Sequence, residues 1–131
     1  MSRARQDLGL RGERIAEKWL LSHGWSVLER RFRSGHRDID LVVARQDGTG
    51  RMIAFVEVKA RSSAQFGGPL GAVSWRKQRE LYRSASVWLA RHPGVGDAYR
   101  FDVIGVLINP GRVRIQHVEN AFSVGRSVGG Q

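Results

Sequence analysis

The stretch that most constrains the fold is residues 38–60, "DIDLVVARQDGTGRMIAFVEVKA", in which two apolar runs flank a short polar segment. The polar segment contains Asp47 followed by Gly48, a pair that is typical of a tight turn between two antiparallel strands. We therefore predict strands at residues 38–44 and 52–60 that pair with each other in one sheet.

Two helices are predicted from apolar residues that recur at intervals of three and four positions. The first spans residues 8–23, ends at Gly24, and places these apolar residues on one face: Leu8, Ile15, Ala16, Trp19 and Leu20. The second follows Ser74, a residue type suited to cap a first turn, and ends at "HPG", residues 92–94. Its shared face carries Gln78, Leu81, Tyr82, Ala85, Trp88 and Leu89.

Three further strands are predicted at residues 25–33, 99–108 and 113–119. The order is helix, three strands, helix, two strands, which predicts an α/β domain with a central mixed sheet flanked by helices. A chain of 131 residues has room for one domain, which we place at residues 1–122, with a flexible tail at 123–131. A glycine-rich loop is predicted between the third strand and the second helix.

The composition narrows the classes of function. Lysine and arginine number 22 against 12 aspartates and glutamates, so the formal net charge is +10 and a nucleic-acid partner is predicted. A basic surface that serves solubility alone is the alternative. Because the chain has no cysteine, disulfides, thiolate zinc sites and cysteine nucleophiles are excluded. It lacks the apolar run of a signal peptide or membrane span, so we expect a cytoplasmic protein without membrane contact.

Charged side chains interrupt both strands of the predicted hairpin. Side chains alternate along a strand, so Ile53, Phe55, Glu57 and Lys59 share one face. On the neighbouring strand the same rule places Asp38, Asp40 and Val42 on one face and Ile39, Leu41 and Val43 on the other. Two carboxylates that converge there would repel each other unless a cation lay between them, which predicts bound Mg²⁺ or Mn²⁺. An exposed Glu-Lys ion pair of little energetic consequence is the alternative.

Glu13 adds a third acid, because it lies at the edge of the core-facing stripe of the first helix and is predicted to point towards the sheet. Beside a bound cation, Lys59 would orient or deprotonate water, or stabilise negative charge on a phosphate. The set of Glu13, Asp40, Glu57 and Lys59 therefore predicts metal-assisted phosphodiester hydrolysis.

Basic residues in two sequence clusters, at 29–33 and 75–83, predict a track for a phosphate backbone. Lys77, in the first turn of the second helix, would reach a phosphate, although a solvated helix lysine is an equally open interpretation. Trp25 and Trp75, near the ends of their elements, are candidates for base contact. The predicted nucleic-acid contacts are Arg31, Arg33, Arg61, Ser62 and Lys77.

Several of these segments resemble the YraN-like family of uncharacterised bacterial proteins, which is related to archaeal Holliday-junction resolvases and other nucleases of the PD-(D/E)xK type. The similarity runs from about Leu10 to Val106. It rests on "GERIAEKWLLSHGW", "DIDLVV", "FVEVKARSSAQFGGPLGAV", Lys77 and "RFDVI" at residues 100–104.

The resemblance implies a restriction-endonuclease-like fold, with Asp40 and Glu57 as metal ligands. It also implies that Lys59 is the catalytic lysine and that Glu13 is the helix acid that completes the site. The family pattern has glutamate where this chain has Asp38, so a supporting role for residue 38 stays open.

Together these features predict an Mg²⁺- or Mn²⁺-dependent deoxyribonuclease that hydrolyses phosphodiester bonds of DNA, including branched or structured DNA, by in-line attack of water. The resemblance implies 5′-phosphate and 3′-hydroxyl products. It also implies that the protein could act as a homodimer, because resolvases cut two strands. The alternative is a catalytically silent nucleic-acid-binding module that retains the nuclease fold.

Overall fold

The structure is a computed structural model that describes residues 2–62 and 73–123. Its elements run α1 (Arg3–Ser22), β1 (Ser26–Ser34), β2 (Arg37–Asp47), β3 (Gly50–Ser62), α2 (Trp75–Arg91), β4 (Ala98–Asn109) and β5 (Arg112–Phe122). The predicted order of helices and strands is therefore confirmed. Most of the predicted glycine-rich loop, and residues 124–131 of the predicted tail, lie outside the described residues.

Both helices begin at a serine whose side chain caps the first turn. The Ser74 hydroxyl accepts a hydrogen bond from the Lys77 N–H at 3.1 Å, as the sequence predicts. The α1 helix begins at Arg3 rather than near Leu8, because the Ser2 hydroxyl accepts a hydrogen bond from the Arg5 N–H. The extra turn is polar and exposed, so apolar periodicity gives no sign of it.

The five strands form one sheet in chain order, β1-β2-β3-β4-β5. Neighbouring strands are antiparallel except β3 and β4, which run parallel because α2 carries the chain back across the sheet between them. The turn between β2 and β3 has Gly48 at φ 64°, as expected for the Asp47-Gly48 pair. The predicted mixed sheet is confirmed.

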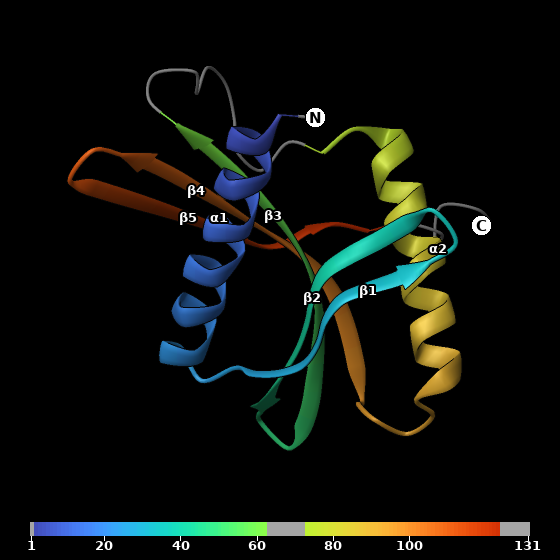
Figure 1. Cartoon of the computed structure of the whole chain (residues 1–131). Helices are drawn as coiled ribbons and strands as arrows, with labels where there is room; N and C mark the ends of the chain where they lie inside the picture. Colours follow the sequence, from blue (N-terminus) through green and yellow to red (C-terminus); the bar gives the residue numbers. More distant parts are fainter. Residues whose placement is uncertain (1, 63–72, 124–131) are drawn as a thin grey trace.

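Each face of the sheet is covered by one helix (Figure 1). Ala16 and Leu20 of α1 pack on one face, against a cluster that includes Val56 and Ile104. Leu81, Ala85 and Trp88 of α2 pack on the other face, against Phe55 and Phe101. The apolar stripes predicted for the two helices are thus the core-facing ones. No helix in the described part of the chain is long and apolar enough to span a membrane.

A buried polar network ties the last two strands to α1. The Asp102 carboxylate is 1% exposed, and it accepts hydrogen bonds from His117 Nε2 at 2.8 Å and from the Asn120 N–H at 2.9 Å. Trp19 of α1 donates its indole N–H to His117 Nδ1 at 3.3 Å, which fixes the proton on Nε2. Burial alone would raise the pKa of Asp102, but these hydrogen bonds and the charge of Arg100 lower it.

The α1 helix comes close to the sheet at Gly12. A methyl group on Gly12 would lie 2.5 Å from the Ala60 side chain, so only glycine allows this approach. The contact fixes the height of α1 over the end of β3. It therefore also fixes the position of Glu13, the next residue along the helix.

We predict that Gly12→Ala destabilises the protein by about 1–3 kcal/mol, because the added methyl group must push α1 away from Ala60. Gly9→Ala is the matched control, since nothing lies within 4 Å of a methyl group there. It should stabilise the helix by roughly 0.5–1 kcal/mol. Urea unfolding of both variants measures the difference, and equal effects of the two substitutions would contradict this view of the contact.

Candidate metal and nucleic-acid site

The regular alternation of side chains in β2 breaks at Ile39. Ile39 is buried in the same cluster as Val42, on the α2 side of the sheet, whereas Leu41 belongs to the α1 side. The sequence prediction that Ile39 lies opposite Val42 is therefore wrong. The reason lies in β1, where Arg31 has φ 54° and pairing passes from Arg30–Leu41 to Phe32–Ile39 without a regular pair between them.

The irregular backbone leaves the Asp40 carboxylate at the point where two strands separate. Ladder pairing between β2 and β3 ends at Leu41 and Val56. Beyond it the Asp40 carboxylate takes the place of a backbone acceptor, because Oδ2 accepts a hydrogen bond from the Val58 N–H at 2.7 Å. Asp40 is thereby held against β3 beside Glu57, the residue before Val58. The predicted approach of these two acids is what the structure contains.

The environment of this pair disfavours negative charge. Burial, the larger cause, and the charge of Glu57 together raise the pKa of Asp40 to about 8, against the lowering effect of the hydrogen bond from Val58. Burial also raises the pKa of Glu57, against the lowering effects of Lys77 and Lys59. With no cation between them, simultaneous ionisation of the two carboxyl groups is therefore unfavourable.

Glu13 faces β1 and is paired with a predicted DNA-binding residue. Its carboxylate accepts a hydrogen bond from the Arg31 side chain at 3.1 Å, and one turn further along α1 Glu17 pairs with Arg30 at 2.6 Å. Consecutive strand residues normally point to opposite faces, so the positive φ of Arg31 explains how both arginines reach the same helix. The charge of Glu13 still contributes to the raised pKa of Asp40.

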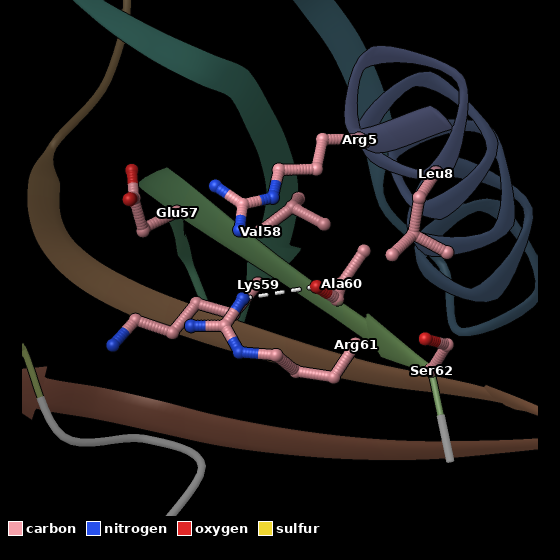
Figure 2. Close-up of a pocket in the computed structure, with 9 residues that line it drawn as sticks. Arg5, Leu8, Glu57, Val58, Lys59, Ala60, Arg61 and Ser62 are labelled. Carbon is pink, nitrogen blue, oxygen red and sulfur yellow. Dashed lines mark hydrogen bonds between the residues drawn. The ribbon is translucent and has the colours of Figure 1, made fainter. Parts of the chain in front are cut away.

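Glu57 and Lys59 line a cleft of about 790 Å³ at the end of β3, between this strand and the first turns of α1. Figure 2 shows their side chains extending to the same side of β3. Arg61 and Ser62, both predicted from the sequence, line the same cleft, and Arg61 donates a hydrogen bond to the Ala60 carbonyl at 2.9 Å. The structure thus brings these four residues of β3 together.

Arg5 is a residue of this cleft that no apolar pattern in the sequence predicts. Its guanidinium group reaches from α1 to the surface of β3 beside Val58 (Figure 2). The signal that would have revealed it is Ser2, since recognising this residue as the helix cap would have placed Arg5 within the first turn of α1.

The two remaining basic residues differ in their relation to the site. Lys77, in the first turn of α2, lies with its ammonium nitrogen 4.0 Å from Glu57, so it faces the site and is not simply a solvated helix lysine. Arg33 is exposed at the far end of β1, in register with Asp38. The sequence candidate Trp25 is 2% exposed and belongs to the core, so its predicted base contact is wrong.

Among the residues that the structure describes, no three acidic or histidine side chains are gathered closely enough to hold a metal ion by themselves. The set of Glu13, Asp40 and Glu57 is thus not assembled as a three-carboxylate cage. Asp40 and Glu57 nevertheless fit a divalent cation, because they offer hard oxygen ligands and their mutual repulsion disfavours ionisation without one. Mg²⁺ in particular is commonly held by one or two carboxylates, with water and substrate phosphate completing its coordination.

Comparison with known proteins shows that Glu13, Asp40 and Glu57 lie in a region shared with a protein family. The profile of a family described as "Uncharacterised protein family UPF0102" matches residues 12–106. A UPF0102 protein of Geobacter metallireducens is 40% identical over 95% of this chain and 98% of its own length. A UPF0102 protein of Syntrophomonas wolfei is 38% identical over 89% of this chain and 98% of its own length. One of Pelobacter propionicus is 42% identical over 91% of this chain and 84% of its own length. The resemblance to an uncharacterised bacterial family is confirmed.

We predict that the stability of the metal-free protein falls as the pH rises from about 5 to about 8. The folded state holds a proton on Asp40 that the unfolded chain releases near pH 4, so ionisation at higher pH costs stability. Asp40→Asn keeps an acceptor for the Val58 N–H and removes the charge. Between pH 5 and pH 8 its free energy of unfolding should therefore rise by on the order of 2 kcal/mol relative to that of wild type.

Unfolding in urea with EDTA, at several pH values, tests this prediction. Asp47→Asn is the control, because it removes the same charge at the opposite end of β2, where asparagine also suits the turn. Parallel pH profiles for wild type and Asp40→Asn would contradict the assignment of a buried, proton-binding Asp40.

Proposed function

From the premise that this chain belongs to the uncharacterised family UPF0102, we propose that it is a metal-dependent nuclease that hydrolyses phosphodiester bonds of DNA. The observation that carries the proposal is the Asp40 carboxylate, fixed by the Val58 N–H next to Glu57 on the strand that also bears Lys59. Structured or branched DNA is the proposed substrate, by the resemblance to resolvases.

Asp40 and Glu57 would hold Mg²⁺ or Mn²⁺. The carbonyl of Val58 would be a further oxygen ligand, because the N–H and C=O of one strand residue point to the same side and its N–H points to Asp40. The bound cation would polarise the scissile phosphate and lower the pKa of an attacking water. Glu13 is the third proposed acid, and it would have to exchange Arg31 for this role.

Lys59 would work beside the cation on the phosphate. Its ammonium group, on the same side of β3 as Glu57, would orient the attacking water and stabilise the negative charge that builds on the phosphate oxygens. As water attacks phosphorus in line, the bond from phosphorus to the 3′ oxygen breaks. The products are then a 5′-phosphate and, once the leaving oxygen takes up a proton, a 3′-hydroxyl.

Basic residues on both sides of the cleft support binding of the DNA backbone. Arg5 enters from α1 and Arg61 from β3, while Lys77 approaches Glu57 from α2. Guanidinium groups suit phosphate oxygens because their planar fork can donate two hydrogen bonds at once. Arg31 and Arg33 on β1 are proposed as further contacts outside the cleft.

One observation favours a second candidate, a nucleic-acid-binding module that cleaves nothing. Glu13 is neutralised by Arg31, so the acidic set is partly paired with protein cations. Such a module would bind DNA through the same basic residues, with Asp40 carrying a proton instead of facing a metal. The two candidates differ in the effect of Glu57→Gln, which removes a metal ligand from an enzyme and little from a binder.

We predict that the protein cleaves DNA only with Mg²⁺ or Mn²⁺, and that Glu57→Gln and Lys59→Ala each lower the rate about 100-fold or more. Linear, single-stranded and four-way-junction DNA are the substrates to compare. Glu119→Gln on β5 and Lys18→Ala on α1 make the same changes at exposed positions, and should leave the rate unchanged.

Binding of DNA without cleavage in every metal and substrate would exclude the nuclease and support the binding module. Equal rates for wild type and Glu57→Gln would instead show that a cleavage activity arises elsewhere or from a contaminant. Binding should be measured alongside, because Glu57→Gln keeps or strengthens DNA affinity if its carboxylate only holds the cation.

We also predict a steep loss of DNA affinity with salt, because each phosphate contact releases counterions from DNA. Replacing Arg5 and Arg61 together by alanine should reduce the slope of log affinity against log salt by about two. The pair Arg112 and Arg114 on β5 is the charge-matched control. A slope that is flat in wild type, or reduced equally by both pairs, would contradict the cleft as the phosphate track.

A further inference from the structure

A second surface with binding chemistry lies on the outer side of α2, away from the sheet. Trp75, Arg76, Arg79 and Arg83 are exposed there, and with Glu80 they line a shallow depression of about 370 Å³. The three arginines recur at intervals of three and four, so they form one row along the helix. With one acid among three cations, the surface is strongly positive.

Trp75 is unlike the other tryptophans of this protein. All four lie in the described part of the chain, and Trp75 is 69% exposed, whereas Trp25 and Trp88 are 2% and 1% exposed and Trp19 packs against the core. Burying an indole ring is normally favourable, so an open ring at the start of a helix that is otherwise well packed calls for a partner.

The open ring is already oriented by a neighbour. The guanidinium carbon of Arg79 lies 4.7 Å from the centre of the Trp75 ring, so it covers one face of the indole as a cation–π contact. Because most of the residue stays accessible, the other face can receive a flat ligand. An aromatic platform within a basic row is the combination that binds unpaired nucleobases together with their phosphates.

This surface and the candidate active site lie on opposite sides of the first turn of α2. Lys77 lies two residues after Trp75 in the first turn of α2, and its ammonium nitrogen is 4.0 Å from Glu57. Side chains of one helical turn thus reach the carboxylates on one side and the indole on the other. A strand whose phosphate lies at Glu57 would pass around the first turn of α2 to reach the row of arginines.

We propose that Trp75, with Arg76, Arg79 and Arg83, is a binding site for an unpaired nucleotide of the DNA substrate. The unpaired base stacks on the indole ring, and the arginines hold the phosphates of the same strand. This assignment rests on the proposed nucleic-acid function and adds to it a preference for DNA in which at least one base is free. Fully paired duplex offers phosphates to the arginines but no base to the ring.

The test is equilibrium binding in EDTA, where metal-dependent cleavage does not occur, followed by fluorescence anisotropy of labelled DNA. Three probes are compared: a short duplex, the same duplex with a bulge of unpaired thymines, and the same bulge built from abasic residues. Trp75→Ala should weaken binding of the thymine bulge about tenfold and leave the other two probes within about twofold.

Matched variants separate stacking from charge. Trp75→Phe keeps an aromatic ring and should restore most of the affinity for the thymine bulge. Arg79→Ala and Arg83→Ala should weaken the binding of all three probes, because every probe has the phosphates that these arginines contact. Arg114→Ala on β5 should leave the binding of all three unchanged. The thymine bulge should also quench tryptophan fluorescence in wild type and not in Trp75→Phe, since the other three indoles pack in the protein.

The outcomes distinguish this inference from the function on which it rests. If wild type binds all three probes with equal affinity, or Trp75→Ala lowers the three affinities by the same factor, the base site is refuted while DNA binding stands. If wild type binds none of the probes, the inference and the proposed function both fail. Because Trp75 is exposed, its replacement should leave the unfolding midpoint unchanged, and a lowered midpoint would assign it a structural role instead.

Discussion

The hydrogen bond between the Val58 N–H and the Asp40 carboxylate, 2.7 Å long, determines the geometry of the whole site. At this point β2 and β3 cease to pair, and a backbone amide that would otherwise be unsatisfied is bound by a side chain. The arrangement brings an acid of one strand against Glu57 of the next. It also places Asp40 where burial and a like charge both oppose its ionisation, and the proposed cation would relieve this repulsion.

The two helices hold this centre from opposite faces of the sheet. The α1 helix approaches Ala60 at Gly12, and its next residue, Glu13, is held by Arg31 of β1. From the other face, α2 brings Lys77 to Glu57. The result is a pair of carboxyl groups, Asp40 and Glu57, within a strongly basic chain, whose net positive charge favours binding of phosphate under the proposed function.

The fold was largely predictable because its signals are local. Apolar periodicity marked both helices, and the Asp47-Gly48 turn marked the hairpin at the centre of the sheet. The pairing of Asp40 with Glu57 followed from alternation along adjacent strands. What alternation could not predict was the break at Ile39, because it depends on the left-handed backbone of Arg31, a residue type that rarely adopts it.

The parts of the site that were missed depend on contacts between elements distant in sequence. Arg5 reaches the cleft only because α1 begins at Arg3, after the Ser2 cap, and packs against β3, and polar residues give no periodic sign of that first turn. Trp25 and Trp75 both lie near element ends, yet one is buried and one is open. Which of them faces solvent is decided by where α1 and α2 pack, and a single sequence does not contain that information directly.

The measurement that tests the central claim most directly is an anomalous-scattering map of crystals grown with Mn²⁺. The claim predicts a peak between the Asp40 and Glu57 carboxylates, within coordination distance of both, that is absent from crystals of Glu57→Gln. A peak at another place, or no peak at saturating Mn²⁺, would show that these two acids do not form a metal site and would contradict the claim.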